Sequence, residues 1–259
     1  MNKYFYMKFF APLYTLSIFV VFTFPACKSK IKTSDDEVYS RHLQRHVPLR
    51  IITTPMPEKK GDMNLLLMNS VELMEAVDTK RILDSVYKTG SIRPLLIVAF
   101  EGNKEDYGFP KTGNQAKDLK EGIQFNEFIM GELYPFIKKK LATRGFYPIA
   151  TCGFGPSAKN AFYVAFHNDD KITLSGLFYP RFDAGEIDAL RYYRNQAAFD
   201  AMIVTGNNND STTRSFTNLH GGKPTITTTF EYAAPVESDG KQMPTPATFA
   251  KFLAWAFKK

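Results

Sequence analysis

Short, continuous apolar runs alternate along this chain with longer segments in which apolar residues recur at helical spacing. A continuous apolar run bounded by polar residues is typical of a strand buried on both faces of a sheet. The predicted strands are residues 46–54, 64–68, 95–100, 171–177, 199–205 and 225–232, and the predicted helices are residues 72–88, 125–141, 158–166 and 248–257. This alternation predicts an α/β fold: a doubly wound, mostly parallel sheet with helices on both faces, in a single domain.

Residues 145–162 form the stretch around which the other elements are arranged. They predict an apolar strand, a turn tight enough to need two glycines, and a helix opened by Pro156. In α/β hydrolases this strand, turn and helix carry the nucleophilic serine in the pentapeptide G-x-S-x-G. We place residues 151–155 there, so Gly153 takes the place of the serine. The elbow's strained positive φ costs a glycine little, and we expect it at Gly153.

The first residues of the chain predict export. Lys3 and Lys8 precede an uncharged apolar run, residues 9–24, which is shorter than the roughly 20 residues of a membrane-spanning helix. With Pro25-Ala26-Cys27 after it, this run resembles a bacterial lipoprotein signal peptide. The resemblance implies cleavage before Cys27 and acylation of its thiol. A non-lipidated export signal is the alternative.

The chain is therefore divided into a signal peptide (1–26), a polar, lipidated tether (27–41) and a domain (42–259). We expect an exported protein in the bacterial cell envelope, in the periplasm or at the outer membrane, held to the membrane by a lipid at Cys27. The whole chain has 33 Lys+Arg and 26 Asp+Glu; two lysines and no acid lie in the leader, which leaves a net charge of +5. This modest excess forms no basic stripe, so nucleic acid is not an expected partner.

Several segments resemble the esterase D and enterochelin-esterase-like branch of the α/β hydrolases. Residues 88–94 with the run 95–100 after them resemble the family's G-x-x-x-P-x-I-V-V segment, and residues 128–137 resemble the helix ahead of its elbow. Residues 174–176 resemble the S-G after the next strand, and residues 252–255 resemble the final helix. The resemblance implies an α/β-hydrolase fold and the chemistry of acyl transfer from an ester.

That chemistry would use a serine nucleophile, a histidine base, an aspartate that orients the histidine, and backbone N–H groups that hold the oxyanion. Asp210, in the loop after the predicted strand 199–205, is the candidate acid. Ser238 stands where the base should be, because residues 235–238 replace the family's P-G-G-H turn. No histidine follows His220.

The family's oxyanion loop follows the strand 64–68 and reads His-Gly, whereas this chain has Met68-Asn69-Ser70. Backbone donors need no particular side chain. Two of them, one from Asn69 or Ser70 and one from Phe154, are therefore expected to point into a pocket.

A glycine at position 153 and the missing late histidine predict a catalytically degenerate esterase-like protein that binds a ligand or assists another protein. The alternative is an active carboxylic-ester hydrolase or acyltransferase that uses Ser157 or Ser238 with His220, and a purely structural envelope protein is a third possibility. Otherwise Ser157 should cap its helix, and Cys152 should be a small buried hydrophobe. The family suggests a small-molecule or glycan ester as ligand. Neither a cofactor nor a metal is expected, since no cluster has metal-ligand spacing.

Overall fold

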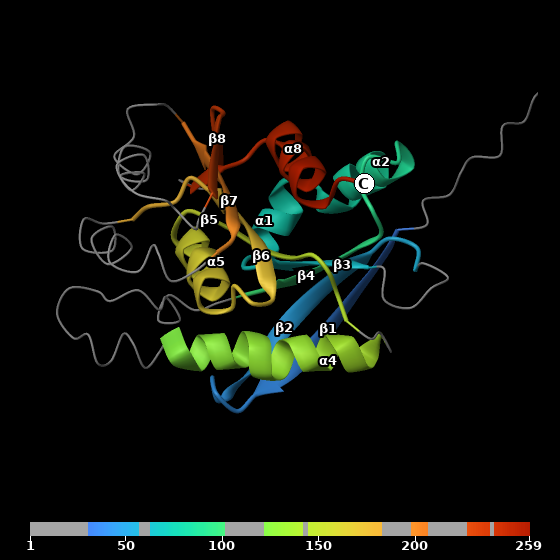
Figure 1. The fold of residues 1–259 in the computed structure, drawn as a ribbon, viewed down its shortest axis with the longest axis vertical. Coiled ribbons are helices and arrows are strands. Elements are labelled where there is room, and N and C mark those ends of the chain that lie inside the picture. The colour runs from blue at the N-terminus through green and yellow to red at the C-terminus, as the bar shows by residue number, and fades with distance from the viewer. Residues whose placement is uncertain are drawn as a thin grey trace, which may run out of the picture.

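A computed structural model describes residues 31–56, 63–101, 122–141, 145–182, 198–206, 227–238 and 241–259. Its main sheet has eight strands in the order β1-β2-β4-β3-β5-β6-β7-β8 (Figure 1). β2 runs antiparallel to β1 and β4, and all the other neighbours are parallel. The strands are β1 (Lys32–Ser40), β2 (Arg45–Thr53), β3 (Asn64–Met68), β4 (Leu95–Phe100), β5 (Ile149–Phe154), β6 (Ile172–Phe178), β7 (Asp200–Thr205) and β8 (Thr227–Tyr232).

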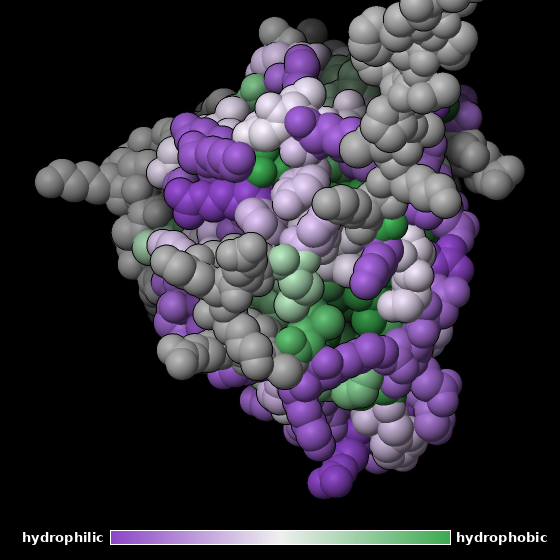
Figure 2. Space-filling view, turned by 90° about the vertical axis from the view of Figure 1, so that its right-hand side faces the viewer, coloured by the Kyte–Doolittle hydropathy of each residue, from purple (hydrophilic) through white to green (hydrophobic). Residues whose placement is uncertain are grey.

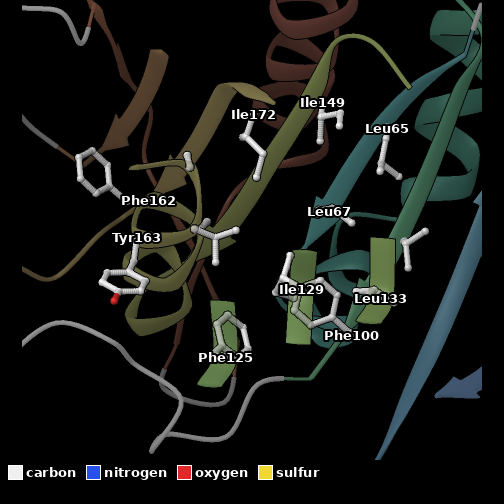
Figure 3. Close-up of a cluster of buried hydrophobic side chains, with 14 of the residues drawn as sticks. Leu65, Leu67, Phe100, Phe125, Ile129, Leu133, Ile149, Phe162, Tyr163 and Ile172 are labelled. Carbon is white, nitrogen blue, oxygen red and sulfur yellow. The ribbon is translucent and has the colours of Figure 1, made fainter. Parts of the chain in front are cut away.

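Helices cover both faces of this sheet. They are α1 (Val71–Ala76), α2 (Thr79–Lys88), the π-helical η2 (Phe128–Leu133), α4 (Tyr134–Lys140), α5 (Pro156–His167) and α8 (Pro246–Phe257); a hairpin of β9 (Val236–Ser238) and β10 (Lys241–Met243) precedes α8. Because successive strand residues point to opposite faces, each buried strand serves two cores. Leu65 and Leu67 pack under η2, α4 and α5 (Figure 3), whereas Leu66 and Met68 pack under α1, α2 and α8. The predicted fold class is confirmed.

Residues 32–40 form β1, so the expected tether, residues 27–41, is wrong for most of its length. β1 pairs with the whole of β2, from Lys32 opposite Thr53 to Ser40 opposite Arg45. A strand at the edge of a sheet leaves most of its side chains exposed, so β1 carries no apolar run by which the sequence could reveal it. The folded part of the chain therefore starts by residue 31 instead of residue 42.

Two predicted helices are irregular in the structure. The helix expected over residues 72–88 is broken at Asp78, which has a φ of 50°, and becomes α1 and α2. The helix expected over residues 125–141 continues past Pro135 because the π-helical turn of η2 comes just before it. A proline ring clashes with the carbonyl four residues earlier in an α-helix, and the wider π turn relieves that contact.

No helix in the described part of the chain is both long and apolar enough to span a membrane. Cys27 and the signal peptide lie outside the described residues.

Candidate functional site

Gly155 makes the turn between β5 and α5. It has a φ of 49° and a ψ of −123°, and α5 begins at the next residue, Pro156. The N–H of Gly155 donates to the carbonyl oxygen of Phe178 at the end of β6, at 2.8 Å. Gly153 lies earlier, within β5, and its φ is not positive. The expectation that Gly153 carries the positive φ of the elbow is therefore wrong.

The space around the two glycines differs as sharply as their backbones. A Cβ on Gly153 would lie 2.4 Å from the carbonyl oxygen of Ser157 and 2.9 Å from the nitrogen of Ala158, both in the backbone of α5. A Cβ on Gly155 would meet no atom within 4 Å. The lack of a side chain at position 153 therefore lets the first turn of α5 lie close to β5. Of these two positions, only 155 has room for a side chain.

Two of the expected backbone donors are already used within the fold. The N–H of Phe154 donates to Oγ of Ser157 at 2.9 Å, and that hydroxyl donates to the carbonyl oxygen of Phe154, also at 2.9 Å. The N–H of Asn69 donates to the carbonyl oxygen of Cys152 at 2.8 Å. Phe154 and Asn69 therefore do not offer their N–H groups to a pocket. Ser157 bonds to the end of β5, so the expectation that it caps α5 is wrong.

The loop after β3 is closed by a carboxylate that sequence reasoning missed. Oε1 of Glu101, the residue after β4, accepts from the N–H of Val71 at 2.6 Å and from that of Glu72 at 3.3 Å. Oγ of Ser70 accepts from the N–H of Leu73 at 3.0 Å and caps α1. The only sequence signal for Glu101 is an acidic residue directly after a buried strand.

Tyr179 is a second residue that sequence reasoning missed. It follows β6 with a φ of 49°, is 4% exposed, and donates its hydroxyl to the carbonyl oxygen of Ala233 at 3.2 Å. Burial raises the pKa of Tyr179 to about 12, so this hydroxyl keeps its proton at neutral pH. Ala233 follows β8, just ahead of residues 235–238, where the family places its histidine turn. Tyr179 therefore ties that segment to the end of the sheet.

Of the triad-equivalent positions Gly153, Asp210 and Ser238, only Gly153 is fully described by the structure. Asp210 and His220 lie outside the described residues, and Ser238 ends β9 with only its backbone described. Ser157 and His167 lie at opposite ends of α5, about 15 Å apart along the helix axis. The described residues also contain no group of three His, Cys, Asp or Glu side chains that could hold a metal ion.

Behind the elbow, on the α5 side of the sheet, lies a small cavity. It has about 10 Å³ of room for the centre of a water molecule, and Asn69, Thr151 and Asn160 contribute to its lining. Asn160 is 1% exposed, and neither its Oδ1 nor its Nδ2 has a hydrogen-bond partner in the described part of the chain. This volume is about that of a single water site.

A wider groove of about 390 Å³ lies between β2 and the start of α1. Five carboxylates help to line it, from Asp35, Asp36, Glu72, Glu75 and Glu101. Arg50 bonds to two of them, those of Asp35 and Glu75. Lys140 bonds to Asp36 and holds the pKa of that carboxyl below its usual value. The groove is acidic but partly neutralised.

Cys152 is confirmed as a buried residue: it is fully buried in β5 and carries a free thiol whose pKa is raised by burial. An exposed thiol ionises near pH 8.5, so the unfolded chain loses this proton first. The contribution of Cys152 to stability is therefore present below about pH 8.5 and decreases as the pH rises above it.

We expect the Cys152 thiol of the native protein to resist 5,5′-dithiobis(2-nitrobenzoate) even at pH 9, and to react within minutes in guanidinium chloride. Cys152→Ala identifies any signal that comes from Cys27. Rapid reaction of the native thiol would contradict the burial.

No known family profile matches the chain, and no curated relative matches it either. Solved structures do. A siderophore hydrolase from Aspergillus nidulans has a TM-score of 0.67 at 10% identity, over 88% of this chain and 95% of that one. An S-formylglutathione hydrolase from Agrobacterium tumefaciens has a TM-score of 0.60 at 14% identity, over 87% and 93%.

The enterobactin esterase of Shigella flexneri, solved in the presence of 2,3-dihydroxy-N-benzoyl-glycine, has a TM-score of 0.60 at 12% identity. That match covers 86% of this chain and 57% of the esterase. Identities this low establish the fold alone. The chain therefore has the esterase-like α/β-hydrolase fold, shared with esterase D and enterobactin-esterase-like serine hydrolases.

Proposed function

We propose that this chain is an esterase-like lipoprotein of the bacterial cell envelope that binds a ligand at a vacated catalytic elbow. The observation that carries the proposal is Gly155. It stands between β5 and α5 with a positive φ, and a side chain there would enter open space. These are the properties of the nucleophile in a sharp strand-to-helix turn. In this register G-x-S-x-G corresponds to residues 153–157, and Gly155 replaces the serine.

The residue after Gly155 supports the same proposal. In the α/β hydrolases the N–H of the residue after the nucleophile is one of the two oxyanion donors. Here that residue is Pro156, which has no N–H. Losing a single oxyanion donor lowers kcat by about 100- to 1,000-fold. Attack and charge stabilisation are thus both impaired, at adjacent positions.

The ligand that we propose is a small-molecule or glycan ester, held without being cleaved. The structural neighbours named above include a siderophore hydrolase and an enterobactin esterase, which makes 2,3-dihydroxy-N-benzoyl-serine a suitable first probe. This probe has the carboxyl and hydroxyl groups from which such an ester is formed, and the acyl esters themselves are the candidate ligands.

We expect binding without turnover. Hydrolysis of p-nitrophenyl acetate by the full chain should stay at the rate of buffer alone, and Gly155→Ser should not raise it. The new hydroxyl would have Pro156 beside it and no described imidazole within reach. Calorimetry with 2,3-dihydroxy-N-benzoyl-serine, which has no ester bond to cleave, should give heat of binding.

Ser157→Ala is the decisive control, because Ser157 is the described hydroxyl nearest to the elbow. Its loss should cost about 1–2 kcal/mol of stability, since two hydrogen bonds to Phe154 disappear, and should leave the background rate unchanged. Turnover by the wild-type chain that Ser157→Ala abolishes, with the fold intact by circular dichroism, would overturn the pseudoenzyme proposal in favour of an active hydrolase.

A further inference from the structure

The chain enters the fold at the N-terminal ends of the parallel strands, whereas the elbow lies at their C-terminal ends. Lys32, the first residue of β1, pairs with Thr53 at the end of β2. The N–H of Thr54 then donates to the carbonyl oxygen of Leu95 at 3.1 Å, at the start of β4. Gly155 follows the other end of β5. The start of β1 therefore lies beside the N-terminal ends of the parallel strands, on the right in Figure 1.

Further backbone hydrogen bonds continue this row of contacts across the N-terminal ends of the strands. The N–H of Asn64 donates to the carbonyl oxygen of Pro94 at 2.9 Å, and that of Tyr147 donates to the carbonyl oxygen of Met63 at 3.2 Å. A bridge between Ile92 and Lys258 brings the end of the chain to the same place. We call the exposed surface along this row the tether-side face; its side chains are Lys32, Met56, Arg93, Tyr147, Lys258 and Lys259.

The tether-side face is cationic with apolar side chains among the charges. Lys32, Arg93, Lys258 and Lys259 are all exposed, and none forms an ion pair with another residue in the described ranges. Met56 is 49% exposed and Tyr147 is 71% exposed. Figure 2 looks onto this side of the molecule and shows hydrophobic surface with hydrophilic side chains around it.

We propose that the tether-side face lies against an anionic lipid surface, so that the elbow points away from the membrane. Only three residues lie between Cys27 and Ile31, so the Cα atoms of these two residues are at most about 14 Å apart. This orientation rests on the proposed acylation of Cys27, which would hold this face close to the lipid headgroups. Cations are attracted to anionic leaflets, and tyrosine suits the interface because one end of its ring is apolar and the other polar.

Helix dipoles explain the positions of only some of the cations on the tether-side face. Cations are favoured at the C-terminal ends of helices, and Lys258 follows the last turn of α8. Lys32 begins a strand and Arg93 lies in a connection, so no helix end explains them. Asp169 and Asp170 precede β6 and also lie at the N-terminal ends of the strands. The cationic surface is therefore confined to the half of these strand ends where the chain enters the fold.

The orientation has a consequence for the elbow. β5 has six residues, which span about 20 Å. The vacated site would therefore face the aqueous space at least that far from the headgroups, and its ligand would arrive from solution instead of from the bilayer.

The test uses the full chain, produced in a bacterium that acylates lipoproteins and inserted into phosphatidylcholine vesicles containing phosphatidylglycerol and a nitroxide-labelled lipid. A fluorophore is attached at Met56→Cys or at Val236→Cys. These sites are equally exposed, at 49%, but Val236 lies after β8, at the elbow end of the sheet. Cys152 is buried, so labelling is selective. Quenching at position 56 should exceed that at position 236 by at least threefold; equal or reversed quenching would overturn the proposal.

A charge-reversal pair identifies the face that makes the contact. Arg93→Glu with Lys258→Glu should abolish the difference in quenching. Arg41→Glu with Arg45→Glu, at the other end of the β1–β2 hairpin, should preserve it. No effect of the first pair would overturn the proposal.

Mass spectrometry of Cys27 separates this inference from the proposed function. An unmodified Cys27 would overturn the lipoprotein proposal alone. Binding of the tether-side face to lipid would then be tested by sedimentation of the unacylated chain with the same vesicles, prepared without the labelled lipid. Binding that Arg93→Glu with Lys258→Glu weakens at least fivefold would support the face. Binding unaffected by that pair, or no binding at all, would overturn it.

Discussion

Gly153→Ala is expected to destabilise the protein by about 4 kcal/mol or more, a large part of the 5–15 kcal/mol of a typical domain. The new methyl group would lie 2.4 Å from the carbonyl oxygen of Ser157 and 2.6 Å from its carbonyl carbon. Neither atom can rotate away, because both belong to the backbone of α5. Relief requires the helix to move off β5, and that motion disturbs the packed core on both sides of it.

Gly155→Ala is the matched comparison, two residues along the same turn. It meets no atom within 4 Å, and its only cost is the positive φ, about 1–3 kcal/mol for a residue with a Cβ. Urea unfolding followed by circular dichroism measures both variants, with the m-value checked for two-state behaviour. A larger loss of unfolding free energy for Gly155→Ala than for Gly153→Ala would indicate that the turn lies at Gly153. That result would contradict the vacated-elbow proposal.

The register of this turn was the main error of sequence reasoning, although a signal for it existed. Both 151–155 and 153–157 fit a G-x-S-x-G pattern in which one flanking glycine is lost, so counting glycines cannot choose between them. Pro156 can. Proline favours the first position of a helix, which makes Gly155 the residue before the helix and hence the turn itself.

The buried parallel strands were predictable because burial on both faces leaves an unbroken apolar run, as in β3 and β4. β1 was not, because its pairing depends on the edge of a sheet already formed by β2. Glu101 and Tyr179 were missed for a related reason. Their partners are backbone groups far away in the sequence, and no local pattern marks such contacts.

The second large effect on stability is expected at Gly176 and Phe252. These residues are in contact, and each belongs to a segment that resembles the esterase family. A Cβ on Gly176 in β6 would lie 2.5 Å from Cε2 of Phe252 in α8. The Phe252 ring is fully buried, and its centroid lies 5.5 Å from that of Phe178 and 6.0 Å from that of Trp255. With neighbours on several sides, the ring cannot turn away. We therefore expect Gly176→Ala to cost about 2–3 kcal/mol by overpacking.

Phe252→Ala should cost about 3–5 kcal/mol, because it empties the volume of a buried ring. Combined with Gly176→Ala, however, the two losses should not add. The methyl group at position 176 would then enter space that the ring has left, so the double variant should be about 1–3 kcal/mol more stable than the sum predicts. Urea unfolding of the four proteins of this cycle measures the coupling.

Phe128→Ala serves as the control for this cycle. Phe128, the first residue of η2, is equally buried but packs in the core on the opposite face of the sheet. Combined with Gly176→Ala, its cost should add to within about 0.5 kcal/mol, as expected for separated sites. Strict additivity of Gly176→Ala with Phe252→Ala would show that α8 does not press on β6. The glycine of the family-like S-G pair would then need an explanation other than the close approach of this ring.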